Sequence, residues 1–196
     1  MIIFGIDPGS ERTGYGCVRT DGSRHHLITC GAIKTRASST FAEKLLVIHS
    51  RLATLLGECR PDAVAIENVF HAVNARSALT LGHARGVAML AAAEAGVEIY
   101  EYTPAEVKRV VVGYGRAEKP QVQQMVKLLL HLAAPPTPHD AADALAVAVC
   151  HIHSRPPART RALECTWQIA TASASAASCG VGSAGRPRSS LTICCT

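Results

Sequence analysis

Four carboxylates stand where predicted elements of the chain begin or end: Asp7, Glu67, Asp140 and Asp143. Asp7 follows a short apolar run and precedes a Pro-Gly turn signal, which is typical of the end of a buried strand. Glu67 closes the apolar run that starts after Asp62 in the same way. Asp140 and Asp143 are three residues apart at the start of an Ala/Val-rich helical pattern, so they share one face of a helix. The four could act together if the fold brings them to one place.

Carboxylate oxygens without nitrogen or sulfur partners are the ligands that hard cations such as Mg²⁺ or Mn²⁺ prefer. Four carboxylates in one place repel one another unless cations neutralise them. Two such ions, about 3.5–4 Å apart, can clamp the attacking and leaving oxygens of a phosphodiester. The sequence contains no nucleotide P-loop, G-x-S-x-G or H-E-x-x-H motif that would favour another chemistry. We therefore expect a metal-dependent phosphodiester-cleaving site.

The first half of the chain predicts how two of these carboxylates meet. Three consecutive strands joined by short turns indicate an antiparallel meander over residues 2–7, 13–20 and 25–33. A helical pattern over residues 40–57 then leads to a strand at 62–67. Because a helical crossover joins parallel strands, we expect this strand to lie parallel to the first. Asp7 and Glu67 would then lie at the same end of the sheet.

The second half predicts an Ala/Gly-rich helix at 74–95, a strand at 97–102, and helices at 103–112, 118–132 and 139–151. The small residues of the 74–95 helix allow either tight packing on the sheet or a self-association surface. Thr137-Pro138-His139-Asp140 also matches a capping box, which would explain Asp140 without any chemistry. A capping box would not explain Asp143, whose neighbours are apolar.

Composition limits the class of protein. The chain has 196 residues, 48% of them hydrophobic, and a formal charge of +5, which mildly favours a polyanionic partner. It contains no long uncharged apolar run, so we expect no membrane span. It lacks a basic segment before its first apolar run and any C-x-x-C pair, which argues against a signal peptide and a structural zinc site. We expect a cytoplasmic nuclease domain over residues 1–155 and a disordered Ser/Ala/Cys-rich tail at 156–196.

Six blocks of residues closely resemble the RuvC-type Holliday-junction resolvases, in that family's order and spacing, over about residues 1–153. They are Gly5-Ile-Asp-Pro-Gly9, Ile66-Glu-Asn-Val-Phe70, Asn74-Ala-Arg-Ser-Ala-Leu79, Gly82-His-Ala-Arg-Gly86, Ala117-Glu-Lys119 with Gln121-Val-Gln123, and Asp140-Ala-Ala-Asp-Ala-Leu-Ala146. The resemblance implies a ribonuclease-H-like α/β fold, with a five-stranded mixed sheet flanked by helices on both faces. It implies a homodimer that nicks four-way DNA junctions at two symmetric places during homologous recombination and DNA repair, leaving ligatable ends. It also implies that the protein works beside the RuvA and RuvB branch-migration proteins.

The resemblance also assigns roles to residues. Asp7, Glu67, Asp140 and Asp143 match the family's catalytic, metal-binding carboxylates, with Asp7 bridging two Mg²⁺ ions that Mn²⁺ can replace. Four further residues match DNA contacts: Phe70, which would stack on a base near the crossover, Lys108 and Lys119, which would lie near the scissile phosphate, and Arg76. Some family members carry histidine in place of the third carboxylate, which makes His139 an alternative to Asp140. The D-A-A-D spacing favours Asp140.

Other interpretations fit part of the sequence. Sugar kinases and heat-shock ATPases share a related strand-Asp-Gly start, but they need two such domains around a nucleotide. A junction-binding protein without cleavage would not need four intact carboxylates. A ribonuclease-H-like nuclease that acts on RNA is the nearest enzymatic alternative.

Overall fold

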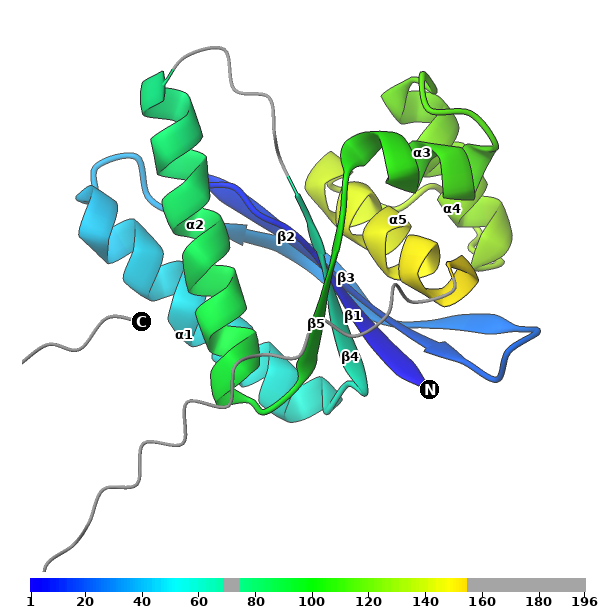
Figure 1. Cartoon of the computed structure of the whole chain (residues 1–196), viewed down its shortest axis with the longest axis horizontal. Coiled ribbons are helices and arrows are strands. Elements are labelled where there is room, and N and C mark those ends of the chain that lie inside the picture. Colours follow the sequence, from blue (N-terminus) through cyan, green and yellow to red (C-terminus); the bar gives the residue numbers. More distant parts are fainter. Residues whose placement is uncertain (69–74, 155–196) are drawn as a thin grey trace, which may run out of the picture. The chain divides into compact units, whose positions relative to one another are not determined.

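The computed structural model describes residues 1–68 and 75–154 (Figure 1). Within these residues the chain forms one mixed sheet of five strands: β1 (Ile2–Asp7), β2 (Arg12–Thr20), β3 (His25–Lys34), β4 (Ala63–Glu67) and β5 (Glu98–Tyr102). The helices of the same residues are α1 (Phe41–Cys59), α2 (Ala75–Glu94), α3 (Pro104–Val112), α4 (Lys119–Leu129) and α5 (His139–His153). All ten elements lie where the sequence patterns predict them, within a few residues at each end.

The strand order in the sheet is β3-β2-β1-β4-β5. The strands β1, β2 and β3 pair antiparallel, as the short turns between them predict. The strand β4 pairs parallel with β1, and β5 pairs parallel with β4. The predicted meander and the predicted parallel crossover are both confirmed, so β1 and β4 end at the same edge of the sheet.

The sheet separates two apolar cores, and Figure 1 shows α1 and α2 on one face with α3, α4 and α5 on the other. Successive strand residues point to opposite faces. In β1, Phe4 and Ile6 therefore pack with α1 and α2, whereas Ile3 packs on the α5 side. In α2 the buried residues are all alanines: Ala84, Ala88, Ala91 and Ala92. Small side chains thus allow α2 to pack closely on its neighbours α1 and β5.

Side-chain caps set the start of two helices. Thr40 and Glu43 form a reciprocal capping box at α1, and Thr103 and Glu106 form another at α3. The helix α5 differs, because its N-cap is Pro138 and no side chain caps it. The capping-box interpretation of Asp140 is therefore wrong, and the carboxylate of Asp140 is available for another role.

Helix α5 lies directly against the backbone of β1 and β2. A Cβ atom built on Gly5 would clash with the Ala144 carbonyl oxygen and lie 2.9 Å from the Ala148 nitrogen. A Cβ atom on Gly14 would clash with the backbone of Asp140. These glycines permit a helix-to-sheet approach that any larger residue would prevent. The position of the first turn of α5 therefore depends on them.

Two predictions concern residues outside the described part of the chain. They are the base-stacking role of Phe70 and the disordered tail at 156–196, and both stay predictions. Among the residues that the structure describes, no helix is long and apolar enough to cross a membrane.

The packing of α5 predicts the effect of adding one methyl group to β1. Gly5→Ala should lower the free energy of unfolding by about 1–3 kcal/mol, the usual consequence of overfilling a packed core. The melting temperature and the denaturant midpoint measure this loss.

Gly57→Ala is the matched control. Gly57 lies in α1, and a Cβ atom there would meet nothing within 4 Å. Because alanine favours a helix over glycine, this change should raise stability by about 0.5–1 kcal/mol. Equal stability of the two variants would contradict the proposed contact between α5 and β1.

Candidate active site

Asp7 and Glu67 lie side by side because their strands are in register. Ile6 pairs with Ile66 in the parallel β1–β4 ladder, and each strand ends one residue later. Both isoleucines are fully buried in the core beneath α1 and α2. By alternation, the next side chains point to the opposite face, toward α5. Two carboxylates from distant parts of the sequence thus project from one sheet edge toward one helix.

Helix α5 supplies the other two carboxylates at the same edge. Gly14 pairs with Asp7 across the β1–β2 ladder, and the backbone of Asp140 lies against Gly14. Asp143 follows one turn later on the same helix, and both aspartates are half-buried. The first turns of a helix favour negative charge, which partly offsets the repulsion between these groups.

The pKa values of Asp7 and Glu67 reflect burial and the nearby carboxylates. Burial raises the pKa of Asp7 from 3.8 to about 9, with further contributions from the charge of Glu67, a hydrogen bond to Glu67, and the charges of Asp143 and Asp140. Burial also raises the pKa of Glu67, and the charge of Asp143 adds to this effect. The two strand-end carboxyls therefore share a proton in the absence of a bound cation. Asp7 is thus within electrostatic reach of the other three carboxylates.

Basic side chains border the carboxylates. Lys119 Nζ lies 3.4 Å from Asp143 Oδ2, and Arg12 Nη1 lies 4.0 Å from Asp140 Oδ2. The charges of Lys119 and Lys108 act on Glu67 and lower its pKa, against the larger effect of burial. Asp143 in turn is the main cause of the raised pKa of Lys119. The predicted lysines at 108 and 119 are thus within electrostatic reach of the carboxylates.

The other predicted residues have different positions. His139 is exposed at the start of α5, whereas Asp140 is half-buried and its charge contributes to the raised pKa of Asp7. Arg76 is exposed in the first turn of α2 and lines a cavity of about 260 Å³ with Ser10, Ser77, Thr80 and Leu81. Arg12 was not predicted from the sequence. Its position follows from the register of β2, in which Arg12 lies two residues before Gly14, the partner of Asp7. Local sequence patterns do not give this register.

The donor set fits a hard divalent cation, since all four side chains offer carboxylate oxygens and their mutual repulsion favours a positive partner. In residues 1–68 and 75–154, however, no group of three or more His, Cys, Asp or Glu side chains is already arranged as a metal site. Asp140 and Asp143 are turned toward Arg12 and Lys119 instead. To hold an ion together with Asp7 and Glu67, the two aspartates would have to turn away from these basic partners.

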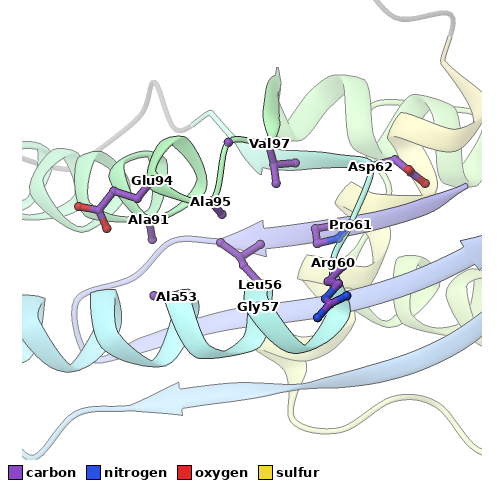
Figure 2. Close-up of a pocket in the computed structure, with 11 residues that line it drawn as sticks. Ala53, Leu56, Gly57, Arg60, Pro61, Asp62, Ala91, Glu94, Ala95 and Val97 are labelled. Carbon is purple, nitrogen blue, oxygen red and sulfur yellow. The ribbon is translucent and has the colours of Figure 1, made fainter. Parts of the chain in front are cut away.

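A cavity of about 540 Å³ lies at the opposite end of the sheet (Figure 2). Its lining includes the last turns of α1 and α2 and the residues that lead into β4 and β5, such as Asp62 and Val97. The carboxylates Asp7 and Glu67 lie at the other ends of these parallel strands. The candidate active site is therefore separate from this cavity.

Comparison with known proteins agrees with this geometry. Residues 3–151 match the sequence model of the family described as Crossover junction endodeoxyribonuclease RuvC. The chain belongs to the RuvC family. Its relative of that name from Ruminiclostridium cellulolyticum is 56% identical over 154 residues, which cover 79% of this chain and 93% of the relative. The relative from Alkaliphilus metalliredigens is also 56% identical and is covered to 94%. As a RuvC-family member, the chain is a crossover junction endodeoxyribonuclease.

Solved structures confirm the predicted ribonuclease-H-like fold. The structure of T. thermophilus RuvC in complex with Holliday junction substrate has a TM-score of 0.75 and 38% identity, and the match covers 78% of this chain and 93% of that chain. The yeast mitochondrial Holliday junction resolvase Ydc2 has a TM-score of 0.55 at 13% identity, which shows a shared fold alone. The recognition of the RuvC-type family from the six sequence blocks is also confirmed.

The crowding of carboxylates predicts that Asp7 destabilises the metal-free protein. Because the pKa of Asp7 is about 9 in the folded chain and 3.8 ordinarily, the folded state holds a proton that the unfolded state has lost between these values. Stability should therefore fall as pH rises through this window. Asp7→Asn should melt at a higher temperature in EDTA, with a difference that grows from pH 5 to pH 9, by roughly 2–4 °C for each kcal/mol of relieved repulsion.

Asp21→Asn is the control for this measurement. Backbone hydrogen bonds from Arg24 and Ser23 lower the pKa of the exposed Asp21 carboxylate. Its replacement should leave the melting temperature unchanged or lower it. A higher melting temperature for both variants would mean that removal of any negative charge stabilises the chain.

Proposed function

We propose that this protein resolves four-way DNA junctions by two symmetric, metal-dependent phosphodiester hydrolyses during homologous recombination and DNA repair. The observation that carries the proposal is the meeting of Asp7, Glu67, Asp140 and Asp143 at one sheet edge. The T. thermophilus relative, 38% identical, is named as a complex with Holliday junction substrate, which supports the same substrate here.

The four carboxylates would hold two Mg²⁺ ions, and Mn²⁺ would substitute for them. When bound, such ions supply positive charge that activates a water molecule and stabilises the leaving oxygen. The absence of nitrogen and sulfur donors from this set is the reason for proposing Mg²⁺ rather than a softer ion.

The remaining side chains of the site act on the DNA backbone. Lys119, Lys108 and Arg12 border the carboxylates, and each can attract a phosphate that the carboxylates alone would repel. Lys119 is exposed, so its ammonium group can move from Asp143 to the reacting phosphate. In the reaction the water oxygen bonds to phosphorus and the bond from phosphorus to the 3′ oxygen breaks. The products are a 5′-phosphate and a 3′-hydroxyl, which a ligase can rejoin.

The protein would act as a homodimer through the solvent face of α2. Leu79, Gly82, Gly86 and Leu90 follow one another at helical spacing on this helix, and all four are exposed. Leu79 is 64% exposed and Leu90 is 51% exposed, and a Cβ atom on either glycine would meet nothing within 4 Å. A second copy packed on this stripe would cover the leucines and set two active sites about a two-fold axis, which suits a junction of near two-fold symmetry.

The cellular setting follows from the family. Branch-migration proteins of the RuvA and RuvB type would present the junction, and the protein would work in the cytoplasm. The four cysteines of the described residues are free, which agrees with a reducing compartment. A ribonuclease and a junction-binding protein without cleavage remain the alternatives that the assays below can distinguish.

The central prediction concerns the carboxylates. Asp7→Asn, Glu67→Gln, Asp140→Asn and Asp143→Asn should each lower Mg²⁺-dependent nicking of a labelled four-way junction by several orders of magnitude, because each change removes a cation ligand. Junction binding in Ca²⁺, measured by gel shift, should survive or tighten because repulsion of the DNA backbone falls.

Asp62→Asn is the control, since Asp62 lies at the opposite end of the sheet and accepts a hydrogen bond from the Ile2 nitrogen. It should nick junctions normally. If Asp140→Asn proved silent and His139→Ala abolished nicking, His139 would replace Asp140 in the site. Full nicking by Asp7→Asn would exclude the two-metal mechanism. Cleavage of an RNA strand in preference to a junction would favour the ribonuclease alternative.

Lys119 should affect the reaction more than binding. Lys119→Ala should lower the single-turnover nicking rate by about ten-fold or more, since a charge placed at the reacting phosphate acts mainly in the transition state. Junction affinity should change by less than a factor of three. Lys127→Ala, on the same helix, is the control and should alter the rate little. Equal losses of rate and affinity for Lys119→Ala would indicate general phosphate attraction only.

Gly86→Leu tests the proposed dimer. Because a side chain at this position meets open space in the single chain, the substitution should leave the melting temperature of the monomer nearly unchanged. It should weaken self-association at least ten-fold in sedimentation equilibrium. A wild-type chain that is monomeric while it nicks both strands would rule out the dimer.

A further inference from the structure

Three polar residues form a bridge on the face of the sheet opposite to the carboxylates. Glu101 of β5 accepts a hydrogen bond from Asn68 Nδ2 through Oε2, at 3.3 Å. Its other oxygen, Oε1, accepts a short ion-paired hydrogen bond from Nη2 of Arg85 in α2. Glu101 therefore joins the residue after β4, the strand β5 and the helix α2. The Arg85 side chain belongs to the Gly82–Gly86 sequence block, to which the site described above assigns no role.

This bridge includes Asn68, the residue that follows Glu67 in the chain. Its backbone N–H donates to the Tyr102 carbonyl oxygen at 2.7 Å, which continues the β4–β5 ladder past Glu67. The Asn68 side chain points to the α2 face because strand residues alternate, and there it meets Glu101. Asn68 is thus held by its backbone and by its side chain. Glu67 lies between this anchor and the fully buried Ile66.

The Arg85–Glu101 ion pair is only partly shielded from water. The Arg85 side chain is 24% exposed and that of Glu101 is 35% exposed. Within the described residues, the Arg85 Nε atom is buried without a hydrogen-bond partner. Glu101 is the charged partner of Arg85, and loss of its carboxylate would remove the ion pair that joins α2 to β5.

The same ion pair lies next to the first buried residue of α2. Ala84 is the first residue of α2 that is buried, and residues 75–79 are exposed. Arg85 follows Ala84 directly, so its bond to Glu101 joins the helix to β5 near the start of the buried part of α2. The N-terminal turns of α2, which carry Arg76, precede the Arg85–Glu101 ion pair in the chain.

We propose that Glu101 is a positioning residue for the nuclease site: it holds Asn68 and Arg85 together and thereby fixes the end of β4 at which Glu67 is presented. The inference rests on the proposed function of Glu67 as a cation ligand. Removal of the bridge would let the strand end fray at Asn68, so that Glu67 would sample orientations away from Asp7. Substrate binding, which depends on basic side chains elsewhere, would be little affected.

Glu101→Gln tests the proposal with two readouts. An amide has one acceptor oxygen and no charge, so it loses the ion pair with Arg85 and cannot accept from both partners through separate oxygens. We expect the nicking rate at saturating Mg²⁺ to fall about 10–100-fold, as for other residues that orient metal ligands, and junction affinity in Ca²⁺ to stay within a factor of two. In EDTA without DNA, hydrogen exchange of the Asn68 amide, followed by NMR, should become at least ten-fold faster. The Thr20 amide, which bonds Met1 at the far end of the sheet, is the internal reference.

Glu94→Gln is the matched control. Glu94, which is labelled in Figure 2, pairs with His49 at 2.9 Å and joins α1 to α2 far from the carboxylates. It should leave both readouts unchanged. Asn68→Ala keeps the ion pair and removes only the neutral bond, so it should reproduce the loss of nicking if Glu101→Gln folds poorly.

The proposal requires slower nicking together with faster exchange at Asn68, and either change alone overturns it. Equal loss of nicking in Glu94→Gln would also overturn it, because the effect would then be one of general stability. A wild-type chain that fails to nick junctions would contradict the proposed function instead, and the exchange experiment would still test the bridge.

Discussion

The direct contact between helix α5 and the backbone of β1 and β2 is the constraint on which the site depends. Side chains normally hold a helix away from the backbone of the sheet that it covers, but Gly5 and Gly14 have none at this crossing. The backbone of Asp140 consequently lies against the strand residue that pairs with Asp7. Main-chain packing therefore brings the four carboxylates to one sheet edge.

This packing brings like charges together, and the surrounding structure compensates for the repulsion. A shared proton lowers the charge of the Asp7–Glu67 pair, while Arg12 and Lys119 each face one aspartate of α5. The rigid aliphatic cores on both faces of the sheet hold the strand ends in place against this repulsion. The repulsion that remains would favour a positively charged partner at this sheet edge.

The sequence predicted those parts of the molecule that depend on local pattern. Apolar runs closed by Asp7 and Glu67, and the helical crossover between them, were enough to place both carboxylates at one sheet edge. The capping-box interpretation of Asp140 failed because Pro138 takes the cap position and no side chain bonds the first turn. Arg12, Arg85 and Glu101 were not predicted, since their partners depend on strand register and on contacts between elements far apart in the sequence. The roles assigned to Phe70 and Arg76 came from family resemblance, and physical reasoning from the residues alone could not supply them.

The position of α5 in the chain has a consequence for biosynthesis. This helix is the last element of the described chain, yet it covers strands β1 and β2, which leave the ribosome first. Until residues 139–153 emerge, Ile3, Val18 and Ala65 of the sheet lack their apolar cover. A nascent chain therefore exposes an apolar surface of the sheet for most of its translation. Contacts between elements so far apart in the sequence also form slowly. The group of four carboxylates is likewise complete only after α5, which carries Asp140 and Asp143, has been synthesised.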